Sequence, residues 1–299
     1  MNSLKIVDAH HHFWDPLKNY YPWLCDEPMI PFRYGDYSSL KKPFMPKDYF
    51  EAASGHAVVK TVTMEGEWDP RDPVGESRWI QSVAETHGFP QAHVAQAWLD
   101  ADNVEEVLEK QARIPLVRSV RHKPRAAASP EQVTAGAPGS MGDPKWRAGY
   151  AMLERHGLHF DLQTPWWHLH EATELASMFP NTLLILNHTG LPSDRSESGL
   201  AGWRTAMTTL AGVPNTVVKI SGLGLPDRKW SIEDNESIIR ATIDIFGIDR
   251  CMFASNFPVD GLVGDLDTII SGFKKALADR PIEEQKKFFH DNAVRIYDL

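Results

Sequence analysis

Residues 7–13 of the chain have the sequence VDAHHHF, which places three histidines in a row at the end of a short apolar run. Side chains two residues apart on a strand lie on the same face, so His10 and His12 are expected to project together, with Asp8 behind them. His11 would point to the opposite face and serve packing. Two imidazoles on one face can bind a divalent metal. A polar strand end with hydrogen-bonded structural histidines is the alternative.

Further short runs of β-branched or apolar residues follow, and stretches with helical spacing separate them. This alternation predicts βα units with a parallel sheet, and eight units favour a closed (β/α)8 barrel, a TIM barrel of the α/β class, forming a single domain over residues 1–299. The predicted strands are Ile6–His10, Val58–Met64, His93–Trp98, Val117–Arg121, His159–Leu162, Leu183–Asn187, Val217–Ile220 and Cys251–Ala254. The predicted helices are Pro46–Ser54, Glu76–His87, Asn103–Ala112, Lys145–His156, His170–Met178, Trp203–Leu210, Asn235–Phe246 and Leu266–Ala278.

Polar residues stand where several predicted strands end, and in a barrel all these ends meet on one face. His188 follows the apolar run Leu183–Leu186 and is expected to be a third metal ligand or a substrate contact, although such a histidine alone is often structural. Glu65 ends the second strand and could be a ligand or a general base, with a solvated loop charge as the alternative. Asn256 ends the eighth strand, where its amide could orient substrate or water but could not accept a proton.

The fourth predicted strand has a cationic end, in the sequence VRSVRHK of residues 117–123. Arg118, Arg121 and His122 are predicted to bind a substrate carboxylate, because a guanidinium matches a carboxylate with two hydrogen bonds. An ordinary ion pair with one of the many acidic residues is the competing interpretation. Gln163 and Trp166, which follow the fifth strand, are predicted as further substrate contacts.

The composition bounds the partners and the location of the protein. The net charge is −9 with both signs mixed along the chain, so no nucleic-acid partner is expected. No apolar run approaches the roughly 18 residues of a membrane span, and the N-terminus is too short and polar for a signal peptide. With only two cysteines, a reducing, cytoplasmic location is expected. A small-molecule substrate is expected, and association into a homo-oligomer stays open.

Several segments resemble one known family. DAHHHFWDP at residues 8–16 resembles the first-strand motif of the amidohydrolase superfamily, and more narrowly the branch of barrel hydrolases that includes sugar-acid lactonases and 2-pyrone-4,6-dicarboxylate lactonase. Residues 187–192 (NHTGLP), 219–223 (KISGL), 253–259 and 292–297 (NAVRIY) are similar to later motifs, in the same order. The resemblance implies a distorted barrel that hydrolyses a lactone or a similar ester. It matches His10 and His12 to the His-x-His pair and His188 to the late-strand histidine, and places Arg121 and His122 among substrate contacts.

One position departs from the family pattern, because Asn256 stands where the eighth strand usually carries a water-activating aspartate. Glu65 is the expected substitute base. The predicted reaction is hydrolysis of a small, polar, acidic lactone with a divalent metal, Zn²⁺, bound by His10, His12, Glu65 and His188. Metal-free operation by the same histidines is an alternative, as are a lactone isomerase, a non-oxidative decarboxylase and a catalytically inactive binding barrel.

Overall fold

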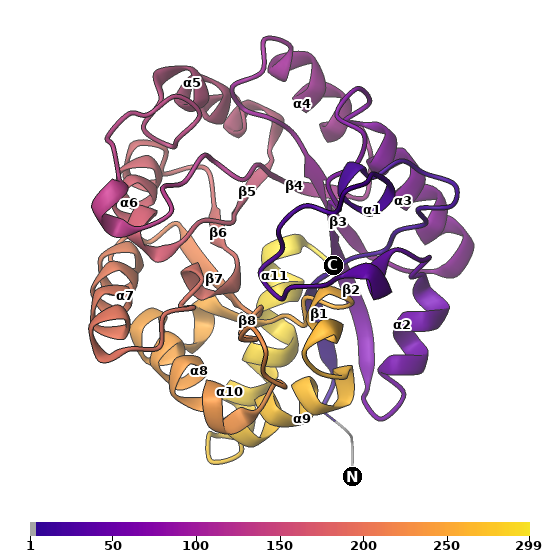
Figure 1. Cartoon of the computed structure of the whole chain (residues 1–299), viewed down its shortest axis with the longest axis vertical. Helices are drawn as coiled ribbons and strands as arrows, with labels where there is room; N and C mark the ends of the chain where they lie inside the picture. Colours follow the sequence, from indigo (N-terminus) through magenta and orange to yellow (C-terminus); the bar gives the residue numbers. More distant parts are fainter. Residues whose placement is uncertain (1–3) are drawn as a thin grey trace.

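The computed structural model describes residues 4–299, and it confirms the predicted eight-stranded parallel barrel. The strands follow one another around the sheet in chain order, each parallel to the next, inside a ring of helices (Figure 1). They are β1 (Ile6–His11), β2 (Val58–Met64), β3 (Ala92–Gln96), β4 (Val117–Arg121), β5 (His159–Leu162), β6 (Leu184–Leu186), β7 (Thr216–Ile220) and β8 (Cys251–Phe253). The predicted strand boundaries agree with these to within two residues.

The barrel closes where β1 meets the segment that follows β8. The backbone N–H of Asn256 donates to the His10 carbonyl at 2.7 Å, and the backbone N–H of His12 donates to the Phe257 carbonyl at 2.8 Å. The buried Asp8 carboxylate supports this seam, since it accepts hydrogen bonds from the Ser255 amide at 2.9 Å and the Tyr49 hydroxyl at 2.6 Å. The first histidine motif and the Asn256 segment are therefore fixed side by side.

The predicted helices are present. Two begin several residues earlier than predicted, at Glu197 and Ile232, and one ends earlier, at Ala151 instead of His156; the other helix starts lie within one residue of the prediction. Ser196 accepts a hydrogen bond from the Gly199 amide and Ser231 accepts one from the Asp234 amide, so each serine caps a helix N-terminus upstream of the predicted first residue. The helices are α1 (Pro22–Cys25), α2 (Pro46–Ala52), α3 (Gly75–His87), α4 (Val104–Ala112), α5 (Pro144–Ala151), α6 (Leu169–Met178), α7 (Glu197–Ala211), α8 (Ile232–Phe246), α9 (Leu266–Ala276), α10 (Ile282–Lys286) and α11 (Asn292–Tyr297).

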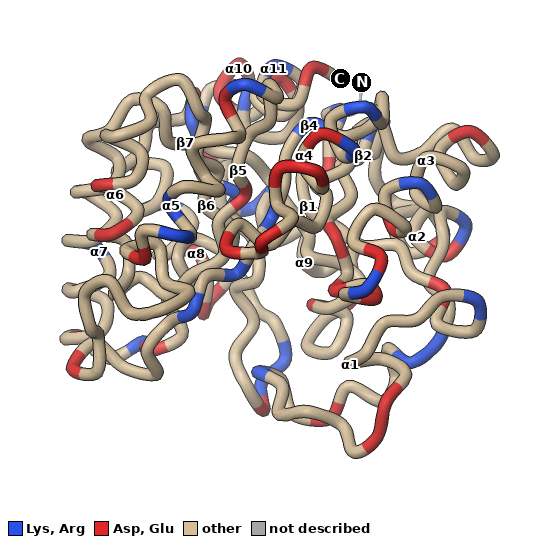
Figure 2. Tube along the Cα trace, turned by 90° about the horizontal axis from the view of Figure 1, so that it is seen from above, with Lys and Arg blue, Asp and Glu red and all other residues tan. Residues whose placement is uncertain are grey.

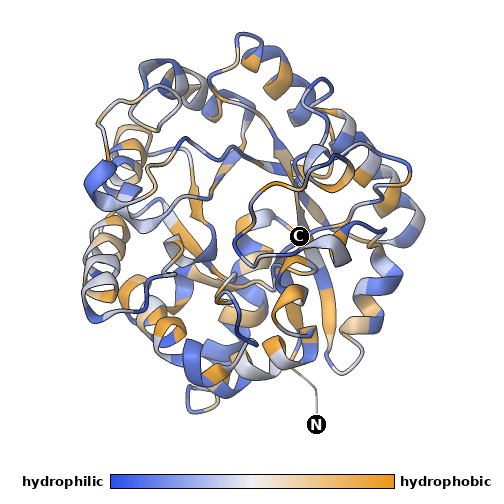
Figure 3. Ribbon diagram, in the orientation of Figure 1, coloured by the Kyte–Doolittle hydropathy of each residue, from blue (hydrophilic) through white to orange (hydrophobic). Residues whose placement is uncertain are grey.

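Two apolar layers hold the barrel together. The larger lies between the strands and the surrounding helices, and the smaller fills the barrel interior with residues such as Val62, Val94 and Ile185. Helix α11 crosses one end of the barrel and packs Ile296 and Tyr297 against that interior. Hydrophobic residues are concentrated on the strands and on the helix faces turned toward them (Figure 3). The opposite end of the barrel, which α11 does not cover, is therefore where a functional site is expected.

The two ends of the barrel differ in their coverings. The C-terminus, α10 and α11 lie at one end, whereas α1 and the loop that carries it extend from the other (Figure 2). Basic and acidic residues are interspersed along the chain trace in the same view. None of the helices formed by residues 4–299 is both long enough and apolar enough to cross a membrane.

Candidate active site

Three histidines from β1 and the end of β6 come together at the open end of the barrel. The ring centroids of His10 and His12 are 5.3 Å apart, and those of His10 and His188 are 4.6 Å apart. All three are buried, and both ring nitrogens of His10 and Nδ1 of His12 have no hydrogen-bond partner. His11 packs instead against Phe13 and Tyr49, with centroid distances of 4.5 and 4.8 Å. The structure thus places the His10 and His12 rings next to each other, as the spacing of the two residues predicts.

His188 has a defined orientation. Its Nδ1 lies 2.9 Å from the Ser221 hydroxyl, which leaves Nε2 free for a ligand. Gly222, the next residue, has a φ of +61°, and a Cβ at this position would lie 2.6 Å from the His188 Nδ1 and 3.2 Å from a guanidinium nitrogen of Arg33. Only glycine allows this approach. His188 itself has a φ of +54°, which is sparsely populated and typical of functional sites.

The three imidazoles are neutral at ordinary pH. Burial, the largest cause, lowers the pKa of His10, His12 and His188 well below the usual value. Positive neighbours act in the same direction, with Arg121 lowering the pKa of His12 and Arg33 that of His188. Neutral imidazoles offer a lone pair, so they can accept a proton or bind a metal.

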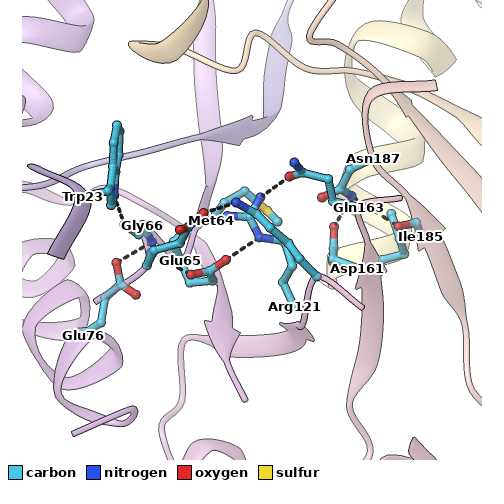
Figure 4. Close-up of polar contacts among 12 residues, drawn as sticks. Trp23, Met64, Glu65, Gly66, Glu76, Arg121, Asp161, Gln163, Ile185 and Asn187 are labelled. Atoms are coloured by element: carbon cyan, nitrogen blue, oxygen red, sulfur yellow. Dashed lines mark hydrogen bonds and ion pairs between the residues drawn. The ribbon is translucent and has the colours of Figure 1, made fainter. Parts of the chain in front are cut away.

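Glu65 is held by Arg121 (Figure 4). Its Oε1 accepts from the Arg121 Nε at 2.5 Å, and its Oε2 accepts from the Glu67 amide at 2.8 Å. Arg121 also donates to the Glu65 carbonyl at 2.7 Å and to the Gln163 side chain at 3.1 Å. With both carboxylate oxygens engaged, Glu65 is not joined to the imidazoles. The carboxylate neutralises and orients a buried arginine, and its role as ligand or base stays a prediction.

The carboxylate absent at position 256 occurs four residues later. The side-chain amide of Asn256 donates to Asp260 Oδ1 at 2.6 Å. The same oxygen accepts from Arg33 and from the Tyr34 hydroxyl, each at 3.1 Å. Asp260 is buried, which raises the pKa of its carboxyl, although the Arg33 charge works against this. Asn256 has a φ of +55°, a conformation that asparagine tolerates better than most residues. Asp260 thus fixes both the Asn256 amide and the Arg33 guanidinium.

The remaining predicted contacts divide into two groups. Gln163 lies beside Arg121 at the site. His122 lines the cavity next to it, but its Nδ1 already accepts from the Leu99 amide at 3.1 Å and the Trp146 indole at 2.9 Å.

Arg118 and Trp166 are not at the site, which corrects their prediction as substrate contacts. Arg118 stands near the beginning of β4, three residues before Arg121 and therefore on the other face, and donates to the Pro115 carbonyl. Trp166 packs against α7, where a Cβ on Gly202 would lie 2.5 Å from its ring.

Two adjoining cavities at this end of the barrel are lined by the predicted site residues. The inner one, of about 320 Å³, is lined by His12, His188 and Asn256 together with Arg33 and Gln163. The second has a volume of about 380 Å³. Trp23, Ile30, Glu67, Arg121 and Lys123 line both, so the cavities adjoin. The inner cavity has three cationic side chains, Arg33, Arg121 and Lys123. Each is paired with a carboxylate, so an anionic ligand would bind to the N–H groups that these ion pairs leave free.

The histidines at the site meet some, but not all, of the requirements for binding a divalent metal. Buried ring nitrogens without a partner, in His10 and His12, are the groups that a metal would satisfy. Within residues 4–299, however, no three His, Cys, Asp or Glu side chains are grouped so that they could hold an ion.

The comparison with known proteins decides the family. A family model described as amidohydrolase matches residues 7–299. The chain belongs to the amidohydrolase family. A protein of Sinorhizobium fredii described as uncharacterised protein y4mH is 39% identical over 297 residues, covering 99% of both chains. An L-fucono-1,5-lactonase of Burkholderia multivorans is 24% identical, covering 100% of this chain and 97% of the relative.

Solved structures agree with the fold of this amidohydrolase. An amidohydrolase from Burkholderia multivorans with bound zinc superposes with a TM-score of 0.80 at 24% identity, covering 98% of this chain and 99% of the other. The predicted resemblance to the superfamily is confirmed. Sequence reasoning missed Arg33 and Asp260, and the position of Asp260 one turn after Asn256 was the signal that could have found it.

Proposed function

We propose that this amidohydrolase hydrolyses a lactone that carries a carboxylate. The observation that carries the proposal is the set of neutral imidazoles facing the same cavity as Arg33, Arg121 and Lys123. An imidazole can accept the proton of an attacking water, and the cations can bind a substrate carboxylate or a developing oxyanion. The full-length similarity to L-fucono-1,5-lactonases supports a lactone as the ester.

His188 is the proposed base. Ser221 holds its Nδ1, so Nε2 faces the ligand. The water oxygen bonds to the lactone carbonyl carbon while the water proton passes to Nε2. The ring C–O bond then breaks, and the leaving alkoxide takes that proton from His188, which gives an open hydroxy acid. Arg121, held in place by Glu65, anchors the substrate carboxylate, and Asn256, held by Asp260, orients the water.

A divalent ion, as in the zinc-bound neighbour, would be held by His10 and His12, with His188 close by. When bound, it would polarise the lactone carbonyl. Because Glu65 is paired with Arg121 and Asn256 carries no charge, we propose that the protein holds this ion loosely.

Removal of the ion is therefore expected to be easy and reversible. Dialysis against a chelator should lower the zinc content and the kcat together, and added Zn²⁺ should restore both. The measurement is elemental analysis beside turnover, with His10→Ala as the variant that should not recover zinc. Full activity in metal-depleted enzyme would contradict the proposal and favour the metal-free alternative.

The test of the reaction class is acid release from a panel of sugar-acid, muconic and pyrone lactones, followed by mass spectrometry of the products. Hydrolysis adds the mass of water. A product of unchanged mass would identify an isomerase, and loss of CO₂ from an aromatic acid would identify a decarboxylase. Either result, with no acid released from any lactone, would overturn the proposed hydrolysis.

A further inference from the structure

The second cavity at the mouth of the barrel has a different character from the inner one. Its wall is built from indole, proline and aliphatic side chains, whereas the imidazoles His12 and His188 line only the inner cavity. The apolar residues of this wall are Pro22, Trp23, Pro28, Ile30, Trp68, Pro70 and Trp98. We name it the tryptophan cavity. Its volume of about 380 Å³ lies in the range of small-molecule sites.

The charged groups of the tryptophan cavity already have partners. Glu65 is paired with Arg121, and Glu67 is paired with Lys123. Asp26 accepts from the Tyr20 hydroxyl at 2.6 Å. Two of the three carboxylates are paired with cations and the third with a hydroxyl, so few polar groups of this cavity remain free to bind the hydroxyl groups of a sugar. The exception is Gln96, whose Oε1 is buried without a partner.

Two tryptophans of the wall are fixed before any ligand arrives. The Trp23 indole donates to the Gly66 carbonyl at 2.8 Å and stacks on Phe32 with an interplanar angle of 4°. Trp68 lies with its centroid 5.1 Å from that of Tyr21. Rigid aromatic walls bind a flat ligand at low entropic cost.

The rim of the tryptophan cavity is left open to solvent. Trp98 is 38% exposed and Ile30 is 52% exposed, although both are large apolar side chains. A planar apolar group that lay between the rim and the fixed indoles would cover this surface. Burial of an aromatic ring against indoles is favourable because it removes apolar surface from water and because it adds aromatic ring contacts.

We propose that the tryptophan cavity binds an aryl substituent of the substrate, so the preferred lactone carries a carboxylate at one end and an aromatic arm. This inference rests on the proposed function for the reacting end. The lactone occupies the inner cavity beside His188 with its carboxylate on Arg121, and the arm passes Lys123 into the tryptophan cavity; Arg121 and Lys123 line both cavities. The protein thereby prefers bulkier lactones than a monosaccharide lactone.

The test compares two substrates that differ only in the arm, paraconic acid and its γ-phenyl derivative. We expect a kcat/KM about tenfold or more in favour of the phenyl compound, and loss of that preference in Trp98→Ala. Trp98→Phe should keep most of the preference, which separates ring contact from a general disturbance. Ile282→Ala, at a 54% exposed residue of α10, is the matched control and should behave as wild type.

A binding measurement separates failure of the cavity from failure of the reaction. Phenylsuccinate and succinate are titrated into wild type and Trp98→Ala by calorimetry, which needs no turnover. Tighter binding of phenylsuccinate that depends on Trp98, with no lactone hydrolysed, would support the cavity and overturn the reaction. Hydrolysis of both lactones with equal kcat/KM and equal binding of the two diacids would overturn the aryl site.

Discussion

His188→Ala is expected to lower kcat/KM for the hydrolysed lactone by about 10²- to 10⁴-fold, the usual contribution of a general base. The reason is geometric. The structure holds the His188 ring with Ser221 on one nitrogen and leaves the other nitrogen free at the inner cavity. The measurement is steady-state acid release, with circular dichroism and thermal unfolding to show that the barrel is intact.

Two further variants separate the chemistry of His188 from its packing. His188→Gln keeps a polar side chain of similar length but removes a group able to take a full proton, so its activity should stay low. Ser221→Ala keeps the imidazole and removes the hydrogen bond that orients it, so kcat should fall by about tenfold with KM little changed. Full activity of His188→Gln would show that His188 is not the base.

The fold could be predicted because its signals are local. Each strand is a short apolar run bounded by polar residues, and each helix carries apolar residues at helical spacing. The largest error at a helix start falls where a side chain outside the periodic pattern sets the boundary. Ser196 begins α7 well before the predicted start, because the cap and not the apolar stripe determines where a helix starts.

The site could be predicted in part for the same reason. His10 and His12 lie two residues apart on one strand, so local geometry brings them together. The partner of Arg121, by contrast, is 56 residues away in the chain, and no spacing indicates that pair. Arg33 lies on a long loop whose path the sequence does not specify. The error at Arg118 was avoidable, since strand alternation puts it on the face opposite Arg121.

The pair formed by Glu65 and Arg121 leads to the second large prediction. Arg121→Met should reduce the free energy of unfolding by about 3–5 kcal/mol, because it leaves a buried carboxylate without its partner. Both side chains are nearly fully buried, at 3% and 4% exposure for Arg121 and Glu65. Burial and the Glu65 charge raise the pKa of the neighbouring Glu76, so a second carboxyl lies close to the unpaired one.

The double variant Arg121→Met with Glu65→Gln should recover much of this stability, since the uncompensated charge is gone. Its activity should nevertheless remain low, because Arg121 lines both cavities and is the proposed anchor for the substrate carboxylate. Denaturant unfolding and kcat/KM for a lactone with a carboxylate are measured on the wild type, both single variants and the double variant. Recovery of activity together with stability would show that Arg121 serves only the fold, and the carboxylate would then need another anchor, for which Arg33 is the remaining guanidinium at the inner cavity.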